Sequence, residues 1–305
     1  MKYLRLLQAA LMLSTVCAYA DPASDPASGD AAGRKQKAEQ LLASLKPQHG
    51  TIKLSGDIAT LQLNDDFYYL SPGDAGRLLT EGWGNLPGIK TLGMIVPQAV
   101  NPLSRGGWGV VVNYIEDGHV SDADAAKIDY NALLQKMQKE DAAENEQRKK
   151  QGYSGLQLLG WAEPPRYDAQ THKLYWAREL KADDADINTL NYSIRVLGRK
   201  GVLELNAVAA MRDLATVKAA MPEVLAFANF TDGNRYTDFD SSTDKVAAYG
   251  LAALVAGGIA AKAGLFAKLG LLLLAAKKFI VIGLVAVAGF FRKLFGGKPK
   301  NPPPG

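Results

Sequence analysis

Cysteine and histidine are scarce among the 305 residues of the sequence. The single cysteine is Cys17, and the three histidines, His49, His119 and His172, lie far apart along the chain. Zinc sites need several such ligands at short, regular spacings, and a disulfide needs two cysteines. The sequence therefore predicts no metal site and no disulfide.

The motifs of common enzyme classes are also missing. The sequence has no G-x-S-x-G turn, no glycine-rich phosphate loop, no H-E-x-x-H pair and no C-x-x-C pair. Each of these motifs holds a nucleophile, a phosphate, a zinc ion or a redox pair in a defined local geometry. We therefore expect no bound cofactor, and a catalytic site would have to be assembled from residues that are distant in sequence.

Acidic residues are missing from the end of the chain. Residues 245–305 contain nine lysines and arginines and no aspartate or glutamate, although the formal net charge of the whole chain is only +4. The preceding stretch, residues 21–244, is therefore acidic overall. An acidic domain argues against nucleic acid as a partner, because phosphates require a basic surface. The basic end instead fits the anionic cytoplasmic face of a lipid bilayer.

The same end carries a long apolar run. Residues 246–295 consist mainly of Ala, Leu, Val, Gly, Ile and Phe, interrupted by lysines. A transmembrane helix needs about 20 mostly apolar residues. Residues 246–267 reach that length if Lys262 extends to a lipid head group. Residues 279–291 either return across the membrane as the second arm of a hairpin or lie in the interface; the positive-inside rule favours one span.

The first 20 residues have the parts of a secretory signal peptide. Lys2 and Arg5 precede an apolar stretch that ends at Ala18-Tyr19-Ala20, which offers small residues at the cleavage positions. We expect cleavage after Ala20, which also removes Cys17. The alternative is an uncleaved N-terminal anchor, for which the apolar stretch is short. The bulk of the chain is therefore expected outside the cytoplasm.

Composition and periodicity divide the chain into six parts. These are a signal peptide (1–20), a flexible leader with a short helix (21–49), an extracytoplasmic α+β domain (50–230), a polar juxtamembrane tether (231–245), a membrane anchor (246–295) and a disordered basic tail (296–305). The expected fold of the domain is an antiparallel sheet covered by two or three helices, followed by a C-terminal transmembrane helix or hairpin.

The clearest local signal is a β-hairpin in residues 190–207, where apolar and polar residues alternate. A turn at Arg199-Lys200 places three apolar pairs on one face, namely Val196 with Leu203, Ile194 with Leu205, and Tyr192 with Ala207. The same register sets Arg195 opposite Glu204 on the other face. That pair is expected to be a surface ion pair that contributes a few tenths of a kcal/mol.

Earlier in the chain, residues 51–63 predict a hairpin, and residues 67–70 and 108–115 predict strands. Ser71 and Pro72 predict a helix start, and Ser121 predicts the cap of a long helix over residues 122–151, whose charged second half is expected to face solvent. Pro164-Pro165 predicts an irregular loop over residues 162–172. Residues 213–228 predict an amphipathic helix that Pro222 kinks.

Several runs closely resemble the bacterial family catalogued as domain of unknown function 2167. The likeness covers roughly residues 50–295 and rests on the runs WGN (83–85), YIEDGHVSDADAAKIDY (114–130), GWAEPPRYDAQTHKLYWAREL (160–180), LNYSIRVLGRKGVLELNAVA (190–209) and STDKVAAYGLAALVAG (242–257). Members are described as uncharacterised membrane-anchored proteins. The resemblance implies a bacterial envelope setting, with the domain outside the inner membrane, and implies no catalytic or ligand-binding residue.

Two classes of function remain, and the sequence favours the first without excluding enzyme activity. The first is a tethered binding or interaction module whose partners are the lipid bilayer and an envelope protein. The second is a membrane-anchored hydrolase of unknown substrate. Its candidate catalytic residues are His172, Asp168 and Arg166, because a histidine beside a carboxylate is a candidate general base.

Overall fold

The computed structural model describes residues 28–85, 87–150 and 154–257. The predicted signal peptide, the first part of the leader, the basic tail and residues 258–295 of the predicted anchor lie outside the described residues. Within the described ranges, no helix is both long and apolar enough to cross a membrane.

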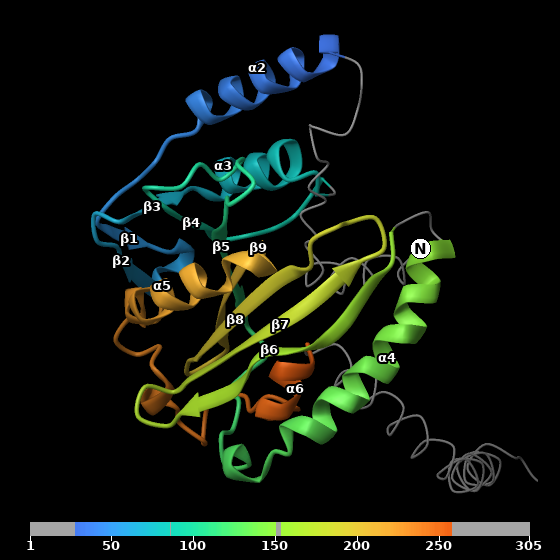
Figure 1. Ribbon diagram of the computed structural model, residues 1–305. Helices are drawn as coiled ribbons and strands as arrows, with labels where there is room; N and C mark the ends of the chain where they lie inside the picture. The colour runs from blue at the N-terminus through green and yellow to red at the C-terminus, as the bar shows by residue number, and fades with distance from the viewer. Residues whose placement is uncertain (1–27, 86, 151–153, 258–305) are drawn as a thin grey trace, which may run out of the picture. The chain divides into compact units, whose positions relative to one another are not determined.

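Antiparallel β-pairing dominates the described chain, so the predicted α+β class is confirmed (Figure 1). Seven strands form the main sheet in the order β3-β4-β5-β9-β8-β7-β6. Their bounds are β3 Phe67–Leu70, β4 Gly93–Pro97, β5 Gly109–Ile115, β6 Leu156–Asp168, β7 Lys173–Ala182, β8 Thr189–Leu197 and β9 Val202–Ala210.

A second, three-stranded sheet contains the hairpin that was predicted for residues 51–63. The strands β1 (Thr51–Lys53) and β2 (Ala59–Gln62) pair around a 3-10 turn, Ser55–Asp57. The third strand, β10 (Ala228–Phe230), comes from far along the chain and pairs with β2. This small sheet therefore ties the beginning of the domain to the end of its last long helix.

The predicted register of the β8–β9 hairpin is confirmed. Val196 pairs with Leu203, Ile194 with Leu205, Tyr192 with Ala207 and Arg195 with Glu204. Strand alternation fixes this outcome, because a slip by one residue would turn every apolar side chain to the opposite face. The hairpin lies at the centre of the sheet, between β5 and β7.

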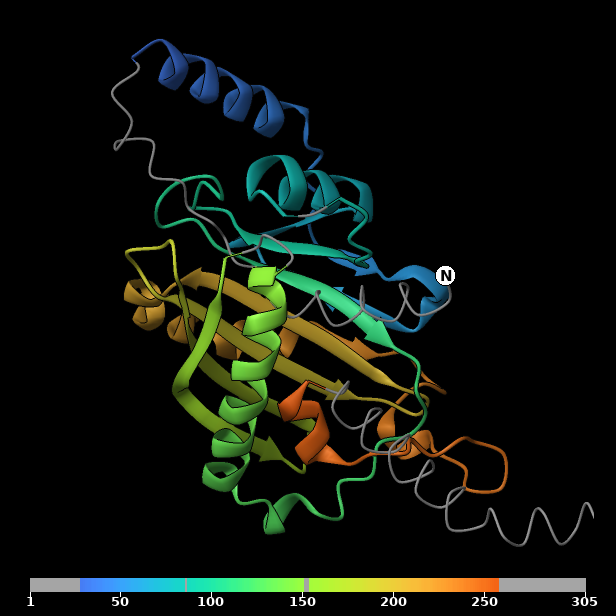
Figure 2. The ribbon, with the colours of Figure 1, turned by 90° about the vertical axis from the view of Figure 1, so that its right-hand side faces the viewer.

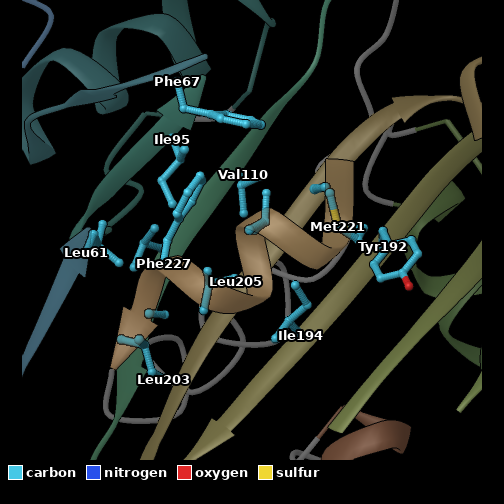
Figure 3. Close-up of a cluster of buried hydrophobic side chains, with 14 of the residues drawn as sticks. Leu61, Phe67, Ile95, Val110, Tyr192, Ile194, Leu203, Leu205, Met221 and Phe227 are labelled. Carbon is cyan, nitrogen blue, oxygen red and sulfur yellow. The ribbon is translucent and has the colours of Figure 1, made fainter. Parts of the chain in front are cut away.

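One face of the main sheet packs against α5 (Leu214–Phe227), which follows the hairpin as predicted. Figure 3 shows Met221 and Phe227 of α5 among apolar side chains of the sheet, such as Ile194 and Leu205. Pro222 lies inside α5. This core also takes in the small sheet, since Leu61 belongs to the same cluster of buried side chains.

The other face of the main sheet is also covered, at both of its ends (Figure 2). At the β6–β8 end, α4 (Tyr130–Lys150) and α6 (Leu251–Ala256) pack over the sheet. At the β3–β5 end, the cover is α3 (Pro72–Arg77), a π-helical turn (Leu78–Gly82) and α2 (Ser28–Ser44). The cap of α3 is as predicted, because the Ser71 Oγ accepts the Asp74 N–H at 3.3 Å.

The prediction that Ser121 caps the long helix is wrong. The helix α4 begins at Tyr130, and the Asp129 carboxylate accepts the N–H groups of Asn131 and Ala132, each at 3.0 Å. Ser121 accepts only the N–H of Ala123, within a local turn. Asp and Ser are equally good N-cap residues, so their types could not decide between Asp129 and Ser121. The path of the folded chain decides between them.

The charged second half of α4, which was expected only to face solvent, also forms hydrogen bonds with the edge strand β6. The Asn145 side chain bonds both the N–H and the C=O of Leu156, at 2.6 and 2.7 Å. The Asp141 carboxylate accepts the Leu158 N–H at 2.8 Å. Because β6 is an edge strand, these polar side chains satisfy backbone groups that have no strand partner on that side.

The predicted loop around Pro164-Pro165 is wrong as well. Strand β6 continues through both prolines to Asp168, with register shifts at Gly160, Glu163 and Arg166 against β7. Proline lacks the N–H that a central strand needs, but an edge strand with bulges tolerates it. The loop between β6 and β7 is therefore limited to residues 169–172.

Residues 231–257, which the sequence assigns to the tether and the start of the anchor, pack on the domain. Arg199 Nε lies 2.7 Å from the Asp244 carboxylate, and Ala247 donates its N–H to the His119 carbonyl at 2.8 Å. Leu251 and Val255 of α6 are fully buried among residues such as Trp176. The described part of the predicted anchor is thus folded onto the sheet.

Candidate functional site

Two of the three histidines stack on one tyrosine at the end of the sheet. The Tyr236 ring lies 4.1 Å from the His172 ring and 4.3 Å from the His119 ring, between centroids. Phe239 stacks on the other side of His119 at 3.9 Å. Tyr236 and Phe239 belong to the segment 231–257, so this ring stack holds that segment against the domain.

Asp122 connects the ring stack to strand β6. Its carboxylate accepts the Tyr167 hydroxyl at 2.6 Å and lies 3.7 Å from His172 Nδ1. Its backbone N–H donates to the Tyr236 hydroxyl at 3.2 Å. The Tyr167 oxygen is also 3.1 Å from His172 Nδ1. Because the Tyr167 hydroxyl donates its hydrogen bond to Asp122, the Tyr167 oxygen accepts a hydrogen bond from His172 Nδ1–H.

Burial and hydrogen bonding set the charges in this cluster. Burial alone raises the pKa of Asp122, but hydrogen bonds from Tyr167 and Tyr236 and the nearby His172 bring the pKa below its usual value. Burial and the Asp122 carboxylate raise the pKa of Tyr167, and burial, followed by Asp122, raises the pKa of Tyr236 to about 12. Asp122 is therefore ionised and both tyrosines are neutral at pH 7.

The structure places only part of the predicted catalytic group near His172. The Asp168 carboxylate accepts the Gln170 N–H at 2.9 Å and the Thr171 hydroxyl at 2.7 Å, so it closes the hairpin loop. Arg166 precedes Tyr167 in β6 and therefore points to the other face, where it acts electrostatically on Tyr192. The carboxylate that His172 faces is Asp122 instead.

A second polar group lies on the sheet face that carries α4 and α6. One row of directly opposed residues crosses five strands in the order Met94, Val111, Asn206, Ser193 and Trp176. The row begins in the apolar cluster of α3 and ends in that of α4, and its middle is polar. We call this middle region the polar band; it comprises Arg178, Asn191, Ser193, Arg195, Glu204 and Asn206.

The amide oxygens of the polar band are occupied by neighbours within it. The Asn191 Oδ1 accepts from Arg178 Nη2 at 3.3 Å, and the Asn206 Oδ1 accepts from Arg195 Nη1 at 3.0 Å. Ser193 Oγ lies 3.1 Å from each of these oxygens. Among the described residues, neither amide nitrogen has a hydrogen-bond partner. The band therefore presents donors.

The ion pair that was predicted at the surface is a buried part of the polar band. Arg195 is 1 % exposed, its Nε lies 2.9 Å from the Glu204 carboxylate, and its guanidinium lies 5.0 Å from the centre of the Trp176 ring. The expectation of a surface pair failed because α4 and α6 cover this face. Burial makes the pair far more sensitive to loss of one partner than a surface pair is.

Arg178 lacks such a carboxylate. Its side chain is 8 % exposed, and its Nε, like that of Arg195, has no hydrogen-bond partner in the part of the chain that the structure describes. Burial, followed by the nearby Arg195, lowers the pKa of Arg178 to about 10. The polar band thus contains two guanidinium groups and one paired carboxylate.

Among the described ranges, no three His, Cys, Asp or Glu side chains gather as a metal site would require. The residues that sequence reasoning missed are Asp122, Tyr236 and Arg178. Tyr236 comes from a segment that looks like a polar tether, and no local pattern connects it with either histidine. The alternation of Asn191, Ser193 and Arg195 was visible, but it indicated a solvent-facing strand side rather than a covered one.

The model of the family described as "Protein of unknown function (DUF2167)" matches residues 46–288, well over half of the chain. The chain belongs to this family. No curated protein matches the DUF2167 chain. Membership of this family does not assign an activity to the protein.

Solved structures offer only weak likenesses to this DUF2167 protein. Cyanobacterial PsbP (CyanoP) from Synechocystis sp. PCC 6803 is 12 % identical with a TM-score of 0.33, covering 62 % of this chain and 94 % of its own. The Ran-binding protein Mog1p of Saccharomyces cerevisiae is 10 % identical with a TM-score of 0.31, covering 65 % of this chain and 100 % of its own. Likenesses of this size assign no function.

The position of His119 predicts a pH dependence of stability. Burial lowers the pKa of His119, against the opposing effects of backbone groups and of Asp122 and Asp244. The folded state therefore resists a proton that the unfolded state binds below about pH 6.5. Stability should fall as the pH drops from 7 to 5.5, with a slope of at most about 1.4 kcal/mol per pH unit from this group.

Urea unfolding of the full chain at pH 7.0 and 5.5 tests this expectation. His119→Phe keeps a stacking ring and should flatten the pH dependence, and His49→Phe, at an exposed histidine, is the matched control. The contribution of the Asp122 carboxylate lies outside this window, because it is lost only as the pH falls below about 4. An unaltered slope in His119→Phe would contradict the assignment.

Proposed function

We propose that this protein is a membrane-held binding module of the bacterial envelope, and that the polar band is its binding surface. The observation that carries the proposal is the set of unpartnered donors at the centre of the sheet, where Arg178 Nε and the amide nitrogens of Asn191 and Asn206 have no partner among the described residues. A buried donor without a partner, such as Arg178 Nε, is costly, and native proteins usually satisfy it.

The membrane half of the proposal rests on the sequence beyond Gly257. Residues 258–295 remain strongly apolar, contain five lysines and one arginine and lack acidic residues. Since residues 231–257 pack on the domain, the apolar stretch would begin at the domain surface rather than after a tether. The signal peptide at residues 1–20 would place the domain on the outer side of the inner membrane.

Site-specific crosslinking in the native membrane tests both halves. A photo-crosslinking side chain at Asn113, which lies in the same cross-strand row as Glu204 and Arg195, would sit at the half-exposed rim of the polar band. The matched control is Lys218, an exposed residue of α5 on the other face of the sheet.

We expect the chain to stay in carbonate-washed membranes, and we expect crosslinked products from position 113 and not from position 218. Full recovery of the wild-type protein in the soluble fraction would contradict membrane attachment. Identical product patterns from the two positions, or none from either, would contradict binding at the polar band.

A second candidate, a hydrolase, is favoured by the geometry around His172. Its Nδ1 is oriented by Tyr167 and faces the ionised Asp122, which is how a general base is commonly held. His172 also has a φ of +53°, an unusual backbone conformation for a residue other than glycine. Strained residues of this kind are enriched at functional sites.

The hydrolase candidate predicts that His172→Ala and Asp122→Asn each abolish complementation of a deletion strain at unchanged protein level. The matched control is Arg166→Gln, because Arg166 is exposed on the other side of β6. Normal complementation by both His172→Ala and Asp122→Asn would eliminate this candidate, whereas the binding module predicts that outcome.

A further inference from the structure

Arg178 occupies a position where a guanidinium is normally paired. It faces Asn191 across β7 and β8, and it hydrogen-bonds the Asn191 amide oxygen only through Nη2. The charged groups that act on it are Arg195, which repels it, and Asp141 and Glu204, which attract it from a distance. None of the described carboxylates forms an ion pair with Arg178.

The two carboxylates that act on Arg178 each form a direct contact with another group. Glu204 is in contact with Arg195, at 2.9 Å, and Asp141 accepts the Leu158 N–H at the sheet edge. Arg178 therefore has no described carboxylate in direct contact, and Asp141 and Glu204 act on its charge only from a distance. Taking such a charge out of water costs several kcal/mol unless an opposite charge accompanies it.

The hydrogen-bonding groups of the polar band also favour a ligand that carries negative charge. The oxygens of Asn191 and Asn206 are taken by Arg178, Ser193 and Arg195, so their free amide groups are nitrogen donors. A ligand for this surface must therefore supply acceptors and a negative charge. A planar guanidinium and amide donors side by side suit a group with several equivalent oxygens.

The least buried edge of the band lies at β9. Asn206 and Glu204 are half-buried, whereas Ser193 and Arg195 on the neighbouring strand are almost fully buried. A ligand that enters over β9 would have to pass the buried Ser193 and Arg195 to reach Arg178 beyond β8. Its charge would replace the carboxylate that Arg178 lacks.

We propose that the polar band binds an oxyanion, such as a phosphate or a carboxylate group, with Arg178 as its charge partner and Asn191 and Asn206 as hydrogen-bond donors. This inference rests on the proposed binding role and is independent of membrane attachment. The oxyanion is either a free solute or the phosphate of a lipid head group, which share the same chemistry at this surface.

Binding is measured by equilibrium dialysis of the full chain in detergent, at constant ionic strength in chloride. Inorganic phosphate is the probe in one arm, and a short-chain phosphatidylglycerol below its micelle concentration is the probe in the other. Saturable binding in the first arm identifies a free oxyanion, and binding in the second arm alone identifies a lipid head group. Either result supports the proposal.

Arg178→Met should weaken binding roughly 30-fold or more, because it removes the charge partner of a buried anion. Its unfolding midpoint should not fall, since an apolar side chain of similar length replaces an unpaired charge. Asn206→Asp is a second variant, which replaces an amide donor with a like-charged oxygen and should abolish binding. The control Lys218→Gln removes the same charge from the opposite face and should bind like the wild type.

Equal affinity of Arg178→Met and the wild type would overturn the proposal, and so would the absence of saturable binding in both arms. In either case crosslinking from position 113 would still report on the binding role. A protein that captures a partner there without binding either anion would keep the proposed function and lose its ligand class.

Discussion

The pairing of β8 with β9 is the constraint on which the rest of the structure depends. Its register turns Ile194 and Leu205 towards α5 and turns Arg195 and Glu204 to the opposite face. Because the hairpin lies between β5 and β7, every other strand of the main sheet takes its position from it, directly or through a neighbour. A one-residue slip would turn the polar set into the α5 core and would turn the apolar set to the face of the polar band.

The same register gives the two faces of the main sheet different compositions. The α5 side is mainly apolar and supplies most of the core, including the contacts with the small sheet. The α4 side is apolar only at its two ends, where helices from different parts of the chain pack. Its centre is the polar band, so the molecule carries buried charge where a sheet of this kind normally carries Leu, Ile and Val. Charge that folding does not require is a reason to look for a ligand.

Sequence reasoning predicted what depends on local pattern. The β8–β9 register, the cap at Ser71 and the helix α5 follow from alternation, capping and the 3.6-residue period. Sequence reasoning failed where contacts between distant residues determine the structure. Asp129, and not Ser121, caps α4. Strand β6 runs through Pro164-Pro165 because it lies at the edge of the sheet. The ring stack and the burial of Arg195 both depend on the packing of residues 231–257 against the domain. No local sequence pattern predicts that packing.

The burial of the Arg195–Glu204 pair is tested most directly by a double-mutant cycle in urea unfolding of the full chain. Glu204→Leu alone should cost about 3–5 kcal/mol, because it leaves Arg195 as well as Arg178 without a carboxylate. Adding Arg195→Met should recover most of that loss, for a coupling energy of about 2 kcal/mol or more. A coupling energy below about 1 kcal/mol, as exposed pairs show, would mean that the pair faces water and that the polar band is not a buried site.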